Sequence, residues 1–212
     1  MTSRDSSHDI AALLPDVDGL RRRCRALAVL ESILGSDFPR YSYTRSWGEG
    51  EAAFMDDGDG NEWTIVFTAD GAFIRVFDHE SPMSPYRDED RELWPGLTDG
   101  LPEVFASQLD DPDFVATAIL WRRPGDETWQ TGANIEFPPG PGPDGSGMLL
   151  ILTDDLAARY AAWATDHYGI AVSAAAVQHV VEGRPLSDAV MRGLNPHARR
   201  DQIIASINVV LS

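Results

Sequence analysis

The sequence predicts an α+β fold in which a mainly antiparallel meander sheet, over about residues 41–152, packs against an N-terminal helix and a C-terminal helical portion. Strand-like alternation with a period of two dominates the first two thirds of the chain, and helical spacing dominates the last third. Short Asp-Gly turns separate the strand candidates, and short connections make neighbouring strands antiparallel. Because strands and helices are segregated along the chain, we expect α+β and not an alternating βαβ arrangement.

Length and composition favour one domain over residues 1–212. The 212 residues are 43% apolar, which is enough for a sizeable core. There are 34 acidic residues and 17 basic residues, all of them arginine, and the formal charge is −17. This balance argues against nucleic acid and anionic membranes as partners and is compatible with a basic protein partner. A charge that only maintains solubility is the alternative.

The N-terminal region is expected to contain a loose tail over 1–14 and a helix over 19–34. Asp18 is the expected N-cap of this helix, and Gly35 is its expected end. Cys24, the one cysteine, lies among arginines and is either a reactive thiol or, as is more common, a small buried hydrophobe. The tail carries no secretory signal and no run approaches the ~20 apolar residues of a membrane span, so we expect a cytoplasmic location.

Four strands are expected in the region after this helix, over 41–47, 51–56, 62–69 and 72–78. In the first, Tyr41, Tyr43 and Trp47 alternate with polar residues. The fourth is apolar on both faces, so we expect it to be central in the sheet and covered by helices.

The remaining elements are predicted with fewer signals. We expect a short helix over 101–109, a strand over 114–121 with a partner over 128–131 that continues through 134–137, a flexible loop over 138–147 and a buried strand over 148–152. A helix capped by Asp154 should extend to about Tyr168. The C-terminal helical portion, 170–212, should hold helices over 173–181, 187–194 and 198–211.

Asp78, His79 and Glu80 end the fourth strand and are the strongest candidates for chemistry. In a continuous strand Asp78 and Glu80 point to one face and His79 to the other. Two carboxylates suit a divalent ion or an acid/base pair, so one hypothesis is a metal-assisted hydrolase. Alternatively, these side chains accept backbone N–H bonds in the turns over 81–86 and only fix the end of the strand.

The turn after Asp56 superficially resembles a calcium loop with Asp57 and Asp59 as candidate ligands. The glycine position of such a loop holds Glu62 and its twelfth position holds Thr68, so the pattern fails at two places. A hairpin explains these residues, and an opportunistic cation site is the alternative. The chain has no zinc-ligand spacing and no phosphate-binding loop, and we expect no cofactor.

Two segments resemble a group of uncharacterised bacterial proteins, a resemblance that covers roughly residues 20–170. They are the turn W-G-E-G-E over 47–51 and the segment 70–85, which begins D-G-A and ends F-D-H-E-S-P-M-S-P. The resemblance implies no established activity. The acidic α+β character is also similar to that of immunity proteins of bacterial toxin systems, as an analogy without matched motif residues.

The first functional hypothesis is therefore a non-enzymatic protein-binding module, for example a toxin-neutralising one. Its surface would be acidic and aromatic, because aromatic side chains anchor partners and carboxylates steer basic ones. The candidate residues are Glu80, Tyr86, Asp88, Glu89, Asp90, Glu92 and Trp94. A further hypothesis is a structural homodimer through the last helix, which requires Ile203, Ile207 and Val210 to be exposed in the monomer.

Overall fold

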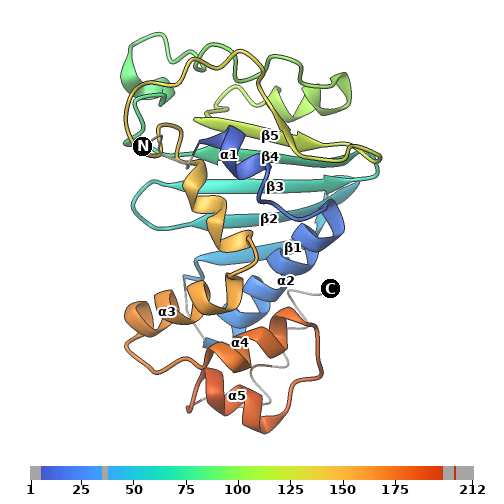
Figure 1. Ribbon diagram of the computed structural model, residues 1–212, viewed down its shortest axis with the longest axis vertical. Coiled ribbons are helices and arrows are strands. Elements are labelled where there is room, and N and C mark those ends of the chain that lie inside the picture. Colours follow the sequence, from blue (N-terminus) through green and yellow to red (C-terminus); the bar gives the residue numbers. More distant parts are fainter. Residues whose placement is uncertain (1–5, 35–37, 198–202, 204–212) are drawn as a thin grey trace.

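The computed structural model describes residues 6–34, 38–197 and 203. Its sheet is an antiparallel meander in which six strands follow one another in chain order (Figure 1). The strands are β1 (Tyr41–Trp47), β2 (Gly50–Asp56), β3 (Glu62–Thr68), β4 (Gly71–Phe77), β5 (Ala118–Arg122) and β6 (Gln130–Thr131). The predicted α+β class and the four predicted hairpin-linked strands are confirmed.

Close backbone packing explains the glycine at the start of β4. Gly71 has a φ of +123°, and a side chain there would clash with the backbone of Arg122 in β5. Only glycine combines this φ with such an approach. Strand β4 is buried on both faces along almost its whole length, which confirms its predicted central place.

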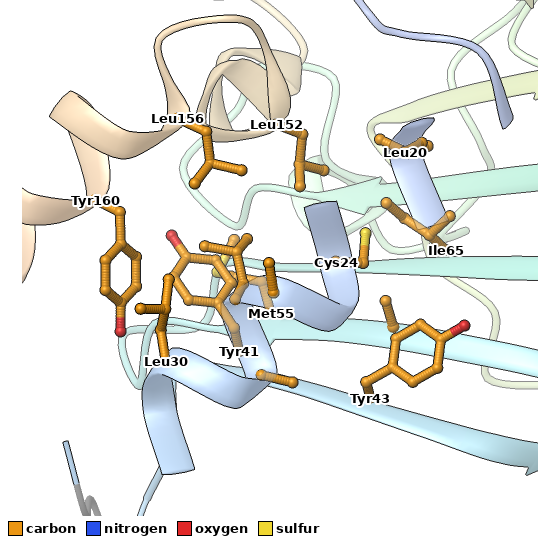
Figure 2. Packing of buried hydrophobic residues seen from close by; sticks show 14 of the residues in the cluster. Leu20, Cys24, Leu30, Tyr41, Tyr43, Met55, Ile65, Leu152, Leu156 and Tyr160 are labelled. Carbon is orange, nitrogen blue, oxygen red and sulfur yellow. The ribbon is translucent and has the colours of Figure 1, made fainter. Parts of the chain in front are cut away.

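One face of the sheet, which we call the helix face, packs against α1 (Ser7–Ala11), α2 (Val17–Leu34) and the 3-10 helix η3 (Ser146–Leu152). Figure 1 shows these three segments in front of the strands. Figure 2 shows side chains of α2, of η3 and of the helix over 156–168 directed towards the sheet: Leu20, Cys24, Leu30, Leu152, Leu156 and Tyr160 against Tyr41, Tyr43, Met55 and Ile65. Cys24 is 2% exposed, and burial raises the pKa of its thiol, so it belongs to the core and not to a reactive site.

The opposite face is covered over β4 and β5 by loops from residues 83–137, which include the 3-10 helices η1 (Pro85–Arg87) and η2 (Glu103–Leu109). A second apolar cluster forms there from Phe73, Met83, Leu97, Phe105, Ala116, Ile119, Trp121 and Ile135. Nearer to β1 the same face is lined by a groove, so we call it the groove face.

The C-terminal helices lie beyond β1, at the lower end of the molecule in Figure 1. They are α3 (Leu156–Tyr168), α4 (Ala174–Val181) and α5 (Asp188–Leu194), and the side chains of Ser173 and Ser187 cap the last two. Among the described residues, no helix is both long and apolar enough to cross a membrane. The helix expected over 198–211 lies outside the described residues except for Ile203, which is 4% exposed.

A buried carboxylate joins these helices to the rest of the protein. Glu31 of α2 is 2% exposed, and Tyr160 and Tyr168 of α3 donate hydrogen bonds to its two oxygens at 2.7 and 2.9 Å. The backbone N–H of Arg40 donates a third at 2.9 Å. Burial raises the pKa of Glu31 although these hydrogen bonds favour its ionised form.

The prediction of a loose tail over 1–14 is wrong for residues 6–14. Asp9 accepts hydrogen bonds from the backbone and hydroxyl of Ser6, which starts α1, and Asp144 accepts one from the Ser7 N–H at 2.7 Å. Ile10 is fully buried. Buried apolar side chains (Ile10, Ala11 and Leu14) and hydrogen bonds at the start of α1 therefore fix this segment to the core.

Three further predictions are corrected. Helix α2 begins two residues earlier than expected, at Val17, because Asp16 and not Asp18 accepts the Gly19 N–H, at 2.6 Å. The apolar run 148–152 belongs to η3 and not to a strand, since Asp144 accepts hydrogen bonds from Ser146 and winds the chain there. The sheet therefore ends at Thr131, β5 starts only at Ala118, and 134–137 is an irregular segment whose Ile135 packs into the second cluster.

Candidate functional site

The groove face holds a cavity of about 660 Å³ between β1–β4 and the segment from the end of η2 to Val115. Its aromatic lining consists of Trp47, Phe54, Phe73, Tyr86 and Phe114, and its charged lining of Glu62, Arg75, Asp111 and Asp113. We call this cavity the sheet groove. Its volume is that of a typical ligand pocket, and its lining combines apolar walls with a few charged groups.

Strand alternation builds the floor of the sheet groove. On β3, Trp63 and Ile65 point into the core of the helix face, so Thr64 and Val66 between them point into the groove. Partner strands continue the pattern, because Thr64 pairs with Phe54 on β2 and with Arg75 on β4. The floor is thus a continuous row across three strands.

A β-bulge places Trp47 in the groove. The pairing of β1 with β2 shifts by one residue between Thr44 and Trp47, so that Trp47 and not Ser46 lies opposite Gly50. Without this shift Trp47 would share the face of Tyr41 and Tyr43, as the sequence pattern suggested. Its ring instead meets that of Phe54 edge-on, with centroids 5.2 Å apart.

Two groove aromatics remain exposed although the protein has a large core. Trp47 is 47% exposed and Tyr86 54%. Tyr86 contacts the ring of Phe77 edge-on at 5.8 Å, and so is held at the β4 end of the groove. Exposed large aromatic rings held by neighbouring rings are typical of binding surfaces, because their burial is completed only by a partner.

The charges of the groove are partly compensated. Arg75 donates to the Val115 carbonyl at 2.5 Å and to Glu62 at 2.6 Å, and it lies over the Phe114 ring at 5.9 Å. Asp111 and Asp113 are exposed, and the N–H of Asp113 donates to Asp111 at 2.9 Å. With Glu62 neutralised by Arg75, these two aspartates leave the groove acidic.

The predicted binding surface is divided between the groove and an adjacent loop over 87–92, which we call the acidic loop. Tyr86 lines the groove, and Asp88, Glu89, Asp90 and Glu92 are exposed in the loop that follows it. Arg87 of this loop donates to the carbonyls of Ser84 and Glu92 at 3.2 and 3.0 Å. The loop is therefore a closed turn that carries its carboxylates outward.

Trp94 and Glu80 are not part of the groove lining. Trp94 is half-buried beside the second cluster, and its indole N–H donates to the Glu136 carbonyl at 3.1 Å. Glu80 is exposed in the turn after β4. Neither is brought together with Tyr86 in one cavity.

Asp78, His79 and Glu80 take part in the turn after β4. Asp78 accepts the Glu80 N–H at 3.0 Å, and its own N–H donates to the Thr117 hydroxyl at 3.1 Å. The Nδ1 atom of His79 lies 3.2 Å from Oδ1 of Asn61. Within the described parts of the chain, no three His, Cys, Asp or Glu side chains are grouped so as to hold a metal ion. The geometry is that of a strand-ending turn.

The turn over 57–61 is likewise built by hydrogen bonds to Asp57. Its Oδ1 accepts the N–H groups of Asp59 and Asn61 at 2.8 and 3.0 Å, and its Oδ2 accepts the Asn61 amide at 2.8 Å. Partial burial opposes ionisation, but these hydrogen bonds lower the pKa of Asp57 overall. Asp57 is thus engaged in the hairpin, and Asp59 is exposed at its tip.

Most groove residues were not singled out from the sequence. Phe54, Phe73 and Phe114 were assigned only to predicted strands, and Asp111 and Asp113 lie between the helix predicted over 101–109 and the strand predicted over 114–121. The alternation of β2 and β3 could have identified the groove-facing rows, but neither the bulge nor the path of 83–117 has a clear sequence signal.

The chain matched no protein-family model, no curated protein and no solved structure. The resemblance to bacterial proteins over 47–51 and 70–85 thus stays a prediction.

Proposed function

We propose that this protein is a non-enzymatic binding protein that holds a basic partner protein in the sheet groove. The observation that carries the proposal is the pair of exposed rings, Trp47 and Tyr86, in a groove that also presents the exposed carboxylates of Asp111 and Asp113. Aromatic anchors supply affinity, and carboxylates supply orientation and a fast encounter. Neutralisation of a basic toxin is one form that such binding would take.

The acidic loop supports the same proposal by its position. It follows Tyr86 directly and presents Asp88, Glu89, Asp90 and Glu92 to solvent. Asp88 forms an ion pair with Arg87 at 3.3 Å. Exposed carboxylates such as these contribute little to stability but create a field that attracts an oppositely charged protein. We propose that the loop steers the partner and that the groove anchors it.

The test is a comparison of groove and control variants in affinity capture. The tagged protein and its Trp47→Ala and Tyr86→Ala variants would be exposed to a lysate of the native cells at low and high salt. Phe38→Ala is the matched aromatic control, because Phe38 is 91% exposed and precedes β1 at the end opposite Trp47. Retained proteins would be identified by mass spectrometry.

The proposal predicts a basic protein that the unmodified protein and Phe38→Ala retain at low salt. Trp47→Ala and Tyr86→Ala should each weaken its retention by about tenfold or more, as expected for the loss of an interface anchor. High salt should weaken it as well, because steering charges are screened. Equal retention by all four proteins would contradict the proposal.

A further inference from the structure

Guanidinium groups lie over aromatic rings at three places around the sheet groove. Arg75 lies over Phe114 at 5.9 Å, Arg87 over Trp94 at 5.2 Å and Arg91 over Tyr86 at 5.0 Å. The planar guanidinium is weakly hydrated and stacks on ring faces, whereas an ammonium group is a compact and strongly hydrated charge. The aromatic side chains of this region therefore already hold arginine side chains of the protein itself.

Arg91 makes fewer contacts through its guanidinium group than Arg75 and Arg87 do. Arg75 and Arg87 each donate hydrogen bonds to backbone carbonyls, in addition to their ring contacts. Among the described residues, the guanidinium of Arg91 has the Tyr86 ring as its contact and forms no hydrogen bond or ion pair. It is thus the most easily displaced of the three.

The backbone at Arg91 also carries strain. Its φ is +54°, and it is the one non-glycine residue with a positive φ in the described part of the chain. A long side chain rarely adopts this conformation, which is less favourable than an extended or helical one. The loop therefore places Arg91 over Tyr86 with an unfavourable backbone conformation.

We propose that Arg91 occupies the position over the Tyr86 ring that an arginine side chain of the partner takes in the complex. On binding, the partner's arginine displaces Arg91 from this ring. The inference rests on the proposed function and specifies the chemistry of the partner, a protein segment that presents arginine. Asp111 and Asp113 of the same groove supply the opposite charge once the partner's guanidinium enters. Arg75, which joins Glu62 and the Phe114 ring, shows the same combination of carboxylate and ring inside the groove.

The test uses two short peptides of equal charge, one of alternating arginine and glycine and one of alternating lysine and glycine. Their affinities for the unmodified protein would be measured by calorimetry at low salt. The arginine peptide should bind about fivefold more tightly or better, because only its side chains stack well. Tyr86→Ala should remove most of that preference. Equal affinities, or no binding of either peptide, would overturn the inference.

The variant Arg91→Ala tests whether Arg91 competes with the partner for the Tyr86 ring or only holds this ring in its orientation. If Arg91 competes with the partner, this variant binds the arginine peptide about threefold more tightly or better, because a larger fraction of the protein is ready to bind. If Arg91 only orients Tyr86, binding weakens or stays the same, and the inference is wrong. Arg159→Ala is the control for the lost positive charge, because Arg159 is exposed on α3. The tightening should exceed that of the control and should persist at high salt.

These results separate the inference from the proposed function. A basic partner that depends on Trp47 in affinity capture, together with no arginine preference and no tightening in Arg91→Ala, contradicts the inference alone. Capture that is unaffected by Trp47→Ala and Tyr86→Ala contradicts the proposed function itself.

Discussion

The two faces of the sheet use the same strands for different purposes. On β3, Trp63 is 1% exposed and packs in the core of the helix face, while its neighbour Thr64 points into the sheet groove. The helix face is closed by α1, α2 and η3, and the groove face is closed by loops over β4 and β5 only. The first face is thus closed by packing along its length, and we propose that the open part of the second face binds a partner.

The difference shows where aromatic side chains contribute stability and where they do not. Tyr41 and Trp63 are each at most 6% exposed, and burial of such rings is a main source of folding free energy. Trp47 and Tyr86 keep about half of their surface in water and so contribute much less. Rings that the fold does not need are the ones a partner would bury.

The largest expected effect is a loss of stability when the helix face is opened. Trp63→Ala should lower the free energy of unfolding by about 3–5 kcal/mol, because it leaves a large cavity in a closed core. Thr64→Ala, one residue further on the groove face, should cost less than about 1 kcal/mol. Urea unfolding followed by circular dichroism measures both, and costs of similar size would contradict the division between the faces.

A smaller effect is the pH dependence of the free energy of unfolding that Glu31 causes. Burial raises the pKa of Glu31 above that of the unfolded chain, which is about 4.3. Below that pH both states are protonated. As the pH rises towards the folded pKa the unfolded chain loses this proton first, so the free energy of unfolding falls.

Glu31→Gln removes this ionisation. The stability of the unmodified protein minus that of Glu31→Gln should become less favourable as the pH rises from about 4 to 8. Exposed Glu103 supplies the control, since Glu103→Gln should leave the pH dependence nearly unchanged. A difference that grows more favourable with pH would contradict the account, and denaturant titrations across this range provide the measurement.

The smallest expected effect lies in the acidic loop. The combined change Asp88→Asn, Glu89→Gln, Asp90→Asn and Glu92→Gln should leave stability within about 0.5 kcal/mol, because these side chains are exposed. It should weaken partner binding about threefold at low salt and little at high salt, since steering charges are screened. Asp166→Asn is the control, because Asp166 is an exposed carboxylate of α3. Binding that is abolished at all salt concentrations would instead make the loop an anchor.

Regular alternation made the sheet predictable, and local exceptions to it made the site unpredictable. The turns around 57–61 and 70–71 fixed the hairpins, so β1–β4 were predicted to within one residue at each end. The bulge that turns Trp47 to the groove face depends on the pairing of β1 with β2 and has no signal within β1 itself. The most exposed ring of the sheet was therefore assigned to the wrong face.

Segments whose conformation depends on contacts with residues distant in the sequence could not be predicted either. The run 148–152 is apolar enough for a strand, and only its connection to Asp144, which also binds Ser7, shows why it winds into η3. Short apolar runs do not distinguish strand from buried helix. By contrast, the alternative that Asp78 and Asp57 fix turns was predicted from the sequence, and the side chains of both residues accept backbone N–H groups two residues further on.

The central claim is that the groove face and not the helix face binds the partner, and methyl NMR tests it most directly. Val66 lines the sheet groove, while its neighbour Ile65 is fully buried on the helix face. On titration with the basic protein retained in affinity capture, the methyl signals of Thr64 and Val66 should shift and those of Ile65 and Ile74 should stay in place. Shifts confined to Val180 and Val181 of α4, with Thr64 and Val66 unchanged, would contradict the account.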